Sequence, residues 1–181
     1  LYRDSRVNRI FEGTNEINRT LIASTLLKTY ELPSKKGNVD EGTLLREKQT
    51  LQLMKKLYHS TIESVRKNDL INLNQEQETA AFIADLVIGI YSAESSILRT
   101  EKAVQITGKD ENSQKIAYTK VFIHETSQMV AIRALNILNH LGDDEAFSRI
   151  AGRLIMSCPE DIVEVKRKIA DVIIEAEKYV F

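Results

Sequence analysis

The chain has 181 residues, 43% of them hydrophobic, and its 25 basic side chains are almost balanced by 26 acidic ones. A net charge of −1 gives no overall field that would attract nucleic acid or an anionic membrane surface. Seven glycines and two prolines are too few for the turns of a β-sandwich or barrel, so the composition favours long helices.

A few residues bear on targeting and compartment. The N-terminal stretch is charged and lacks the apolar segment of a signal peptide, and no run approaches the roughly 20 apolar residues that span a bilayer. The single cysteine, Cys158, excludes an internal disulfide and fits a reducing compartment. We therefore expect a cytoplasmic protein, with the mitochondrial matrix side as the alternative. Because the first residue is Leu1 rather than methionine, we expect a piece of a longer product.

Apolar side chains that recur every three or four residues predict six helices and no strand. The first is expected to start at Thr14 as N-cap, after a tight turn at Gly13, with Glu16 at the positive end of the helix dipole. Pro33 should end it by Glu31, because the residue before proline is biased away from helical geometry. The predicted helices span residues 14–30, 41–68, 75–107, 113–141, a short segment up to 156 and a segment from 159 to the C-terminus.

The order of these helices defines the expected fold. Gly108 and Gly142 are predicted C-caps, and Pro159 is expected in the first turn of the last helix. Residues 80–93 are apolar nearly all round, which predicts a central position for the third helix. With short connections, the sequence predicts an all-α fold, an antiparallel up-and-down bundle of five to six helices.

Residues 2–19 form the densest local pattern, YRDSRVNRIFEGTNEINR. Removing the proton next to a thioester carbonyl needs a carboxylate whose pKa is raised by apolar surroundings, and Glu12 follows two large apolar residues. Gly13 would let a substrate approach the backbone closely, and a helix start at Thr14 would offer N–H groups to a cofactor. The alternative is a surface glutamate beside an N-cap, which short motifs of this kind often are.

The same segment resembles the active-site signature of the acyl-CoA dehydrogenase family over nearly its whole length. In that family the glutamate of the Glu-Gly-Thr motif removes the α-proton of an acyl-CoA while hydride passes to N5 of FAD. The resemblance implies that Glu12 is the catalytic base and that Gly13 touches the thioester region of the substrate. It also implies that Thr14, Asn15 and Glu16 line the FAD. Some branches hold the base on another helix, and this chain resembles those that keep it here.

The remainder resembles, less closely, the helical C-terminal extension of very-long-chain acyl-CoA dehydrogenases. The stretches that carry this likeness are residues 84–91, 98–99 and 128–138. In those relatives the extension packs on the dehydrogenase core of a homodimer and is tied to membrane association. The only basic cluster here is residues 166–168, which a solvated helix face explains, so membrane association is not expected.

The resemblance also implies a domain division and a set of partners. The parts are the end of the dehydrogenase domain, a linker and the extension, at residues 1–30, 31–43 and 44–181. The implied reaction is dehydrogenation of fatty acyl-CoA in β-oxidation, with an electron-transfer flavoprotein or similar acceptor, in a homodimer or homo-oligomer. We expect the piece alone to be inactive, because most of the flavin site and acyl pocket would lie upstream. The competing hypothesis is a non-catalytic helical packing or oligomerisation module.

A metal site is the remaining alternative. Glu94 and Glu125 fall near the apolar stripes of two predicted helices, with His124 adjacent. A ferritin-like di-iron site needs Glu-x-x-His on two helices, and neither glutamate has it. We therefore expect no metal, and instead ion pairs with Arg99 or Arg133.

Overall fold

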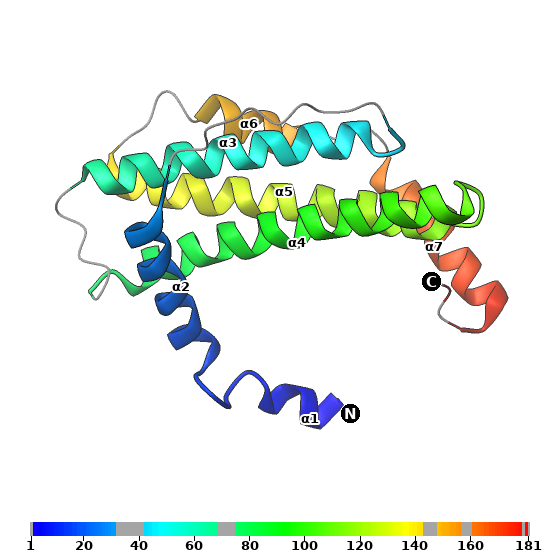
Figure 1. Ribbon diagram of the computed structural model, residues 1–181, viewed down its shortest axis with the longest axis horizontal. Coiled ribbons are helices and arrows are strands. Elements are labelled where there is room, and N and C mark those ends of the chain that lie inside the picture. Colours follow the sequence, from blue (N-terminus) through cyan, green and yellow to red (C-terminus); the bar gives the residue numbers. More distant parts are fainter. Residues whose placement is uncertain are drawn as a thin grey trace.

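The computed structural model describes residues 2–31, 42–68, 75–142, 148–156, 161–178 and 180. Within these ranges every regular element is a helix, which confirms the predicted all-α bundle (Figure 1). The helices are α1 (Tyr2–Val7), α2 (Asn15–Thr29), α3 (Leu45–Lys67), α4 (Gln77–Thr107), α5 (Ser113–Leu141), α6 (Ser148–Met156) and α7 (Ile162–Ala176). The sequence did not predict α1.

Helices α3, α4 and α5 form the centre of the bundle. α4 runs antiparallel to α3, and α5 runs antiparallel to α4 (Figure 1). α4 packs against α2, α3 and α5. Its buried side chains recur at helical spacing and include Ile83, Leu86, Ile90 and Ile97. The third predicted helix therefore occupies the central position expected for it.

Helix α2 crosses one end of α4 and is held there by a carboxylate (Figure 1). Arg19 Nε lies 2.8 Å from Asp85 Oδ1, and Arg133 Nε lies 3.3 Å from Asp85 Oδ2. Asp85 is on α4, Arg19 on α2 and Arg133 on α5. One partly buried aspartate thus ties three helices together.

A cluster of rings anchors the C-terminal end of α2 to α3. Tyr30 Oη lies 3.0 Å from His59 Nδ1, and the Tyr30 ring meets the Tyr58 ring edge-on. The Arg66 guanidinium lies 5.6 Å from the centre of the Tyr30 ring. Burial lowers the pKa of His59 and raises the pKa values of Tyr30 and Tyr58. His59 is therefore a partly buried member of this cluster, because Tyr30 reaches it from the end of another helix.

Local signals placed most helix ends correctly. Thr14 caps α2, and Gly108 and Gly142 follow α4 and α5 as C-caps. The last helix begins at Ile162 rather than 159, because the Asp161 side chain accepts hydrogen bonds from the first free N–H groups. It ends at Ala176, short of the C-terminus. Most of the predicted linker, including Pro33, lies outside the described residues, and so does Pro159.

Helix α4 bears on the expectation that no segment of the sequence is apolar enough to span a bilayer. By length and composition alone, α4 could cross a bilayer, although the sequence showed no uninterrupted apolar run of that length. Core helices of bundles pass the same test, and α4 is one of the three helices at the centre of this one. Burial against three neighbouring helices accounts for part of this composition, since 39% of the apolar window of α4 is buried.

Candidate active-site segment

The Glu12 segment is a tight turn between α1 and α2. Ile10 N and Phe11 N donate to Val7 O at 2.9 and 3.0 Å, which closes α1. Glu12 then has φ 54° and Gly13 has φ 95°, so two consecutive residues are left-handed. For a residue with a Cβ this conformation costs about 1–2 kcal/mol. The backbone therefore holds Glu12 in a strained geometry, and such strain gathers at functional sites.

Gly13 is required at this turn for two reasons. Its positive φ favours glycine, and a Cβ placed there would lie 2.8 Å from Asn18 Oδ1. Asn18 Nδ2 donates to Gly13 O at 3.0 Å, which holds the turn against α2. Asn18 thus fills the one direction in which a Cβ on Gly13 would project.

Thr14 and its neighbours form the start of α2. Thr14 Oγ1 accepts a hydrogen bond from Ile17 N at 3.4 Å, which confirms Thr14 as the N-cap. Asn15 N donates to Arg9 O at 3.2 Å. The backbone N–H of Glu16 and the Thr14 hydroxyl hold the pKa of the exposed Glu16 carboxylate below its usual value. The first backbone N–H groups of α2 are therefore already hydrogen-bonded within the chain. A ligand at this helix start would be contacted by side chains.

The apolar enclosure expected around Glu12 is not supplied by the described residues. Glu12 is exposed, and Ile10 and Phe11 beside it are 66% and 68% exposed. Ile17 and Leu21, four residues apart on α2, are 62% and 63% exposed. These four apolar residues lie on α2 and in the turn before it, in the N-terminal part of the chain that extends away from the bundle (Figure 1).

The two glutamates considered as metal ligands form ion pairs instead. Lys55 Nζ lies 2.6 Å from Glu94 Oε1, and Lys166 Nζ lies 2.5 Å from Glu125 Oε1. Among the described residues no group of three potential ligands could hold a metal ion. The predicted arginine partners were wrong, because Arg133 pairs with Asp85 and lysines from α3 and α7 reach the glutamates first.

Two family models, both described as "Acyl-CoA dehydrogenase, C-terminal domain", match residues 1–27 and 64–150, together more than half of the chain. A curated "Probable acyl-CoA dehydrogenase" from Bacillus subtilis (strain 168) is 34% identical over 200 residues, with 98% of this chain and 33% of the relative covered. The chain belongs to the acyl-CoA dehydrogenase family. The family recognised from residues 2–19 is thereby confirmed.

A solved structure agrees in shape as well as sequence. The crystal structure titled acyl-CoA dehydrogenase complexed with FAD from Bacillus anthracis superimposes with a TM-score of 0.85 and 33% identity. The match covers 99% of this chain and 34% of that one. The chain thus spans about a third of the length of the acyl-CoA dehydrogenases it matches.

Proposed function

We propose that this chain is the C-terminal part of an FAD-dependent acyl-CoA dehydrogenase in which Glu12 is the catalytic base. The observation that carries the proposal is the left-handed Glu12–Gly13 turn at the start of α2, within a segment that a family model matches. Ordinary surface glutamates have no need of a strained backbone.

The chemistry assigned to Glu12 depends on what covers it. An α-proton next to a thioester is weakly acidic, so its base works best with a pKa raised by apolar surroundings. Ile10, Phe11, Ile17 and Leu21 form an apolar surface, defined by these four side chains, most of which the described residues leave exposed. We propose that the dehydrogenase core covers this face in the whole enzyme and removes water from Glu12.

The start of α2 fits the polar edge of a flavin cofactor. Thr14 and Asn15 are half-buried and present an uncharged hydroxyl and amide beside the strained turn. Gly13 would lie against the substrate thioester, and Thr14, Asn15 and Glu16 would hold FAD. When bound, FAD would accept the hydride from the β-carbon of the substrate. The Glu12 carboxylate would accept the α-proton.

The remaining assignments follow from the same proposal. Residues 1–30 would close the dehydrogenase domain, 31–43 would be the linker and 44–181 the extension. The substrate would be a fatty acyl-CoA of β-oxidation, and the electron acceptor an electron-transfer flavoprotein or similar protein. The enzyme would be a homodimer or homo-oligomer in the cytoplasm or on the mitochondrial matrix side. The 181-residue piece would be inactive by itself.

The test compares Glu12→Gln with wild type in the full-length protein, using anaerobic bleaching of the flavin by a panel of acyl-CoAs. We expect wild type to bleach and the variant to lose at least about two orders of magnitude in rate, the usual contribution of a general base. Glu31→Gln, an exposed glutamate just after α2, is the matched control and should bleach normally. Bleaching by Glu12→Gln at the wild-type rate would place the base elsewhere.

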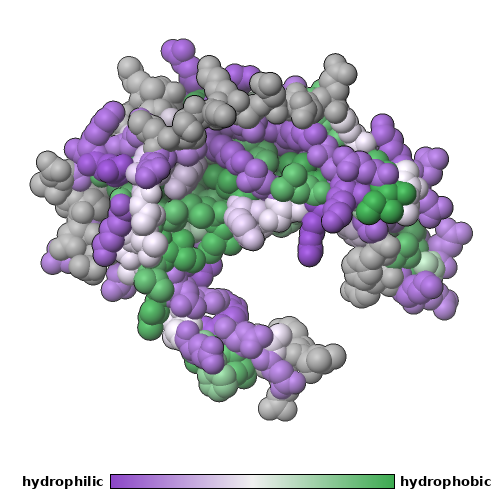
Figure 2. Space-filling model, in the orientation of Figure 1, coloured by the Kyte–Doolittle hydropathy of each residue, from purple (hydrophilic) through white to green (hydrophobic). Residues whose placement is uncertain are grey.

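One observation favours the second candidate, a packing module. Tyr91 and Leu98 on α4 are 71% and 60% exposed, and Ile88 on the same face is 42% exposed. Figure 2 shows hydrophobic side chains gathered beside α2 and a hollow beneath the bundle, between the N-terminal arm and α7. Sedimentation of the 181-residue chain tests this role: a monomer at high concentration would exclude self-association through α4.

A further inference from the structure

A groove follows the seam between α4 and α5 near α7. It consists of two adjoining hollows of ≈ 600 Å³ and ≈ 940 Å³. Ser96 of α4 and Tyr118 of α5 line both hollows, so the two lie side by side along the seam. Each volume lies in the range of about 300–1,000 Å³ that is usual for small-molecule sites.

The smaller hollow is apolar at its base. It is lined by Val121 and Phe122 from α5 and by Ile169 from α7. Glu125 and Lys166 also line it, and their side chains form an ion pair at 2.5 Å. This pair carries no net charge, so the hollow offers an apolar surface with a neutral polar rim.

The larger hollow is cationic. Arg99 and Lys115 line it, with the hydroxyls of Ser92 and Ser95, and no described aspartate or glutamate does. Within the described ranges Arg99 has no ion pair, and Lys115 donates to Asn112 Oδ1, a neutral amide, at 3.0 Å. Two cationic side chains thus line one hollow together with hydroxyl groups, and no described carboxylate lines it with them. Such a set of donors suits a carboxylate or phosphate.

Tyr118 marks the junction of the two hollows. Its hydroxyl is buried, yet it has no hydrogen-bond partner in the part of the chain that the structure describes. Buried hydroxyls are almost always satisfied. A ligand with a polar atom at this junction would supply the missing partner.

We propose that this groove binds a single-chain amphiphile with an anionic head, a long-chain carboxylate. The head lies between Arg99 and Lys115, and the chain runs past Tyr118 to Phe122. The reverse orientation would place the carboxylate beside Lys166, whose charge Glu125 already neutralises, so that end of the groove offers no unpaired cation. The groove lies on α4, α5 and α7, and the proposal stands whether or not Glu12 is a catalytic base.

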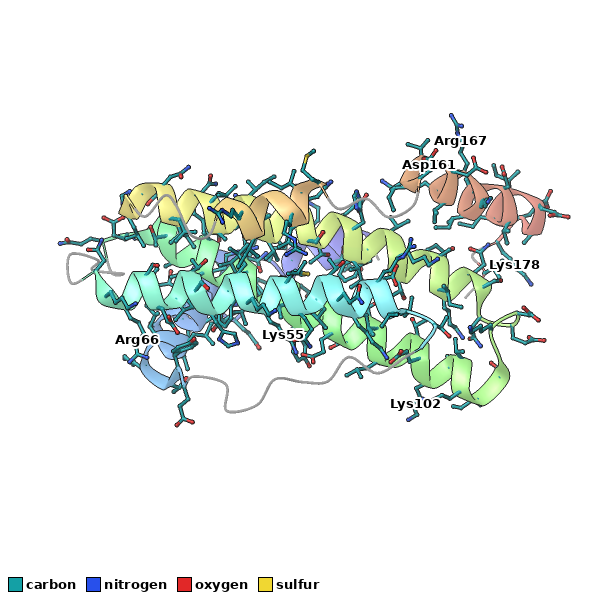
Figure 3. All side chains as sticks on the ribbon, turned by 90° about the horizontal axis from the view of Figure 1, so that it is seen from above. Lys55, Arg66, Lys102, Asp161, Arg167 and Lys178 are labelled. Atoms are coloured by element: carbon teal, nitrogen blue, oxygen red, sulfur yellow. The ribbon has the colours of Figure 1, made fainter. Side chains whose placement is uncertain are left out.

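The test is titration calorimetry of the 181-residue chain with dodecanoate. We expect saturable one-to-one binding that Arg99→Gln weakens roughly fivefold, the effect of one exposed ion pair. Lys102→Gln is the matched control, because Lys102 lies on the same helix and projects away from α7 (Figure 3). It should bind as wild type does. Ser96→Leu fills the junction and should abolish binding, with helix content checked by circular dichroism.

Ligand variants test the two halves of the groove separately. Dodecanol lacks the anion and should bind more weakly than dodecanoate, and acetate lacks the chain and should not bind measurably. The proposal is overturned if dodecanoate does not saturate, if Arg99→Gln and Lys102→Gln lose affinity equally, or if folded Ser96→Leu binds normally. Binding of phosphatidylglycerol vesicles that requires Arg99, without binding of free dodecanoate, would also overturn it and assign the cations to a lipid surface.

Discussion

Replacing glycine by alanine should destabilise the protein at Gly89, where α4 and α5 are in close contact. The same replacement should stabilise it at Gly152, where there is open space. A Cβ on Gly89 would lie 2.8 Å from Met129 Cε and 3.2 Å from Cγ2 of both Thr126 and Val130. Met129 can move, but the other two side chains are β-branched and stiff. On Gly152 of α6, an added Cβ would meet nothing within 4 Å.

The two effects on Gly89→Ala can be compared in size. Replacing a helical glycine by alanine gains about 1 kcal/mol, and overfilling a packed core costs about 1–3 kcal/mol. We expect a net loss of roughly 1 kcal/mol for Gly89→Ala, since two of its three neighbours are rigid. Gly152→Ala should keep only the gain, about 0.5–1 kcal/mol.

Urea unfolding of the purified chain, followed by circular dichroism, measures both free-energy changes, and thermal unfolding measures the melting temperatures. The melting temperatures of the two variants should differ by roughly 4–8 °C, with Gly89→Ala the lower. Gly89→Ala as stable as Gly152→Ala would show that α4 and α5 are not in contact at the spacing described here.

Two further predictions concern the contacts that hold α2 in place. Asp85→Asn should lower the free energy of unfolding by about 1–3 kcal/mol, because Arg19 and Arg133 both lose their anion. Urea unfolding measures this change. A decrease no larger than that caused by replacing an exposed aspartate would contradict the prediction. Burial lowers the pKa of His59 beside Tyr30, so the unfolded chain binds its proton more readily. The contribution of His59 is therefore present above its ordinary pKa of 6.5 and is lost as the pH falls from there through the lowered value. His59→Phe should flatten the fall in melting temperature over that window, and an unchanged pH profile would refute this reasoning.

Local sequence determined the helices and the family of this protein. Thr14, Gly108 and Gly142 end or begin helices through groups within a few residues of themselves, so their positions could be read without a partner. The Glu-Gly-Thr signature is local in the same sense. The left-handed backbone at Glu12 had no such signal, because a residue other than glycine rarely adopts it.

Only the tertiary structure decided which side chains meet. Lys55 reaches Glu94 from a separate helix, and no spacing along the sequence predicts that ion pair. Ile17 has the spacing of a core residue, but it stays exposed because α2 crosses only one end of α4. The groove at Tyr118 depends on the crossing of three helices. Helical periodicity fixes which residues share a face, whereas the packing of whole helices fixes what that face touches.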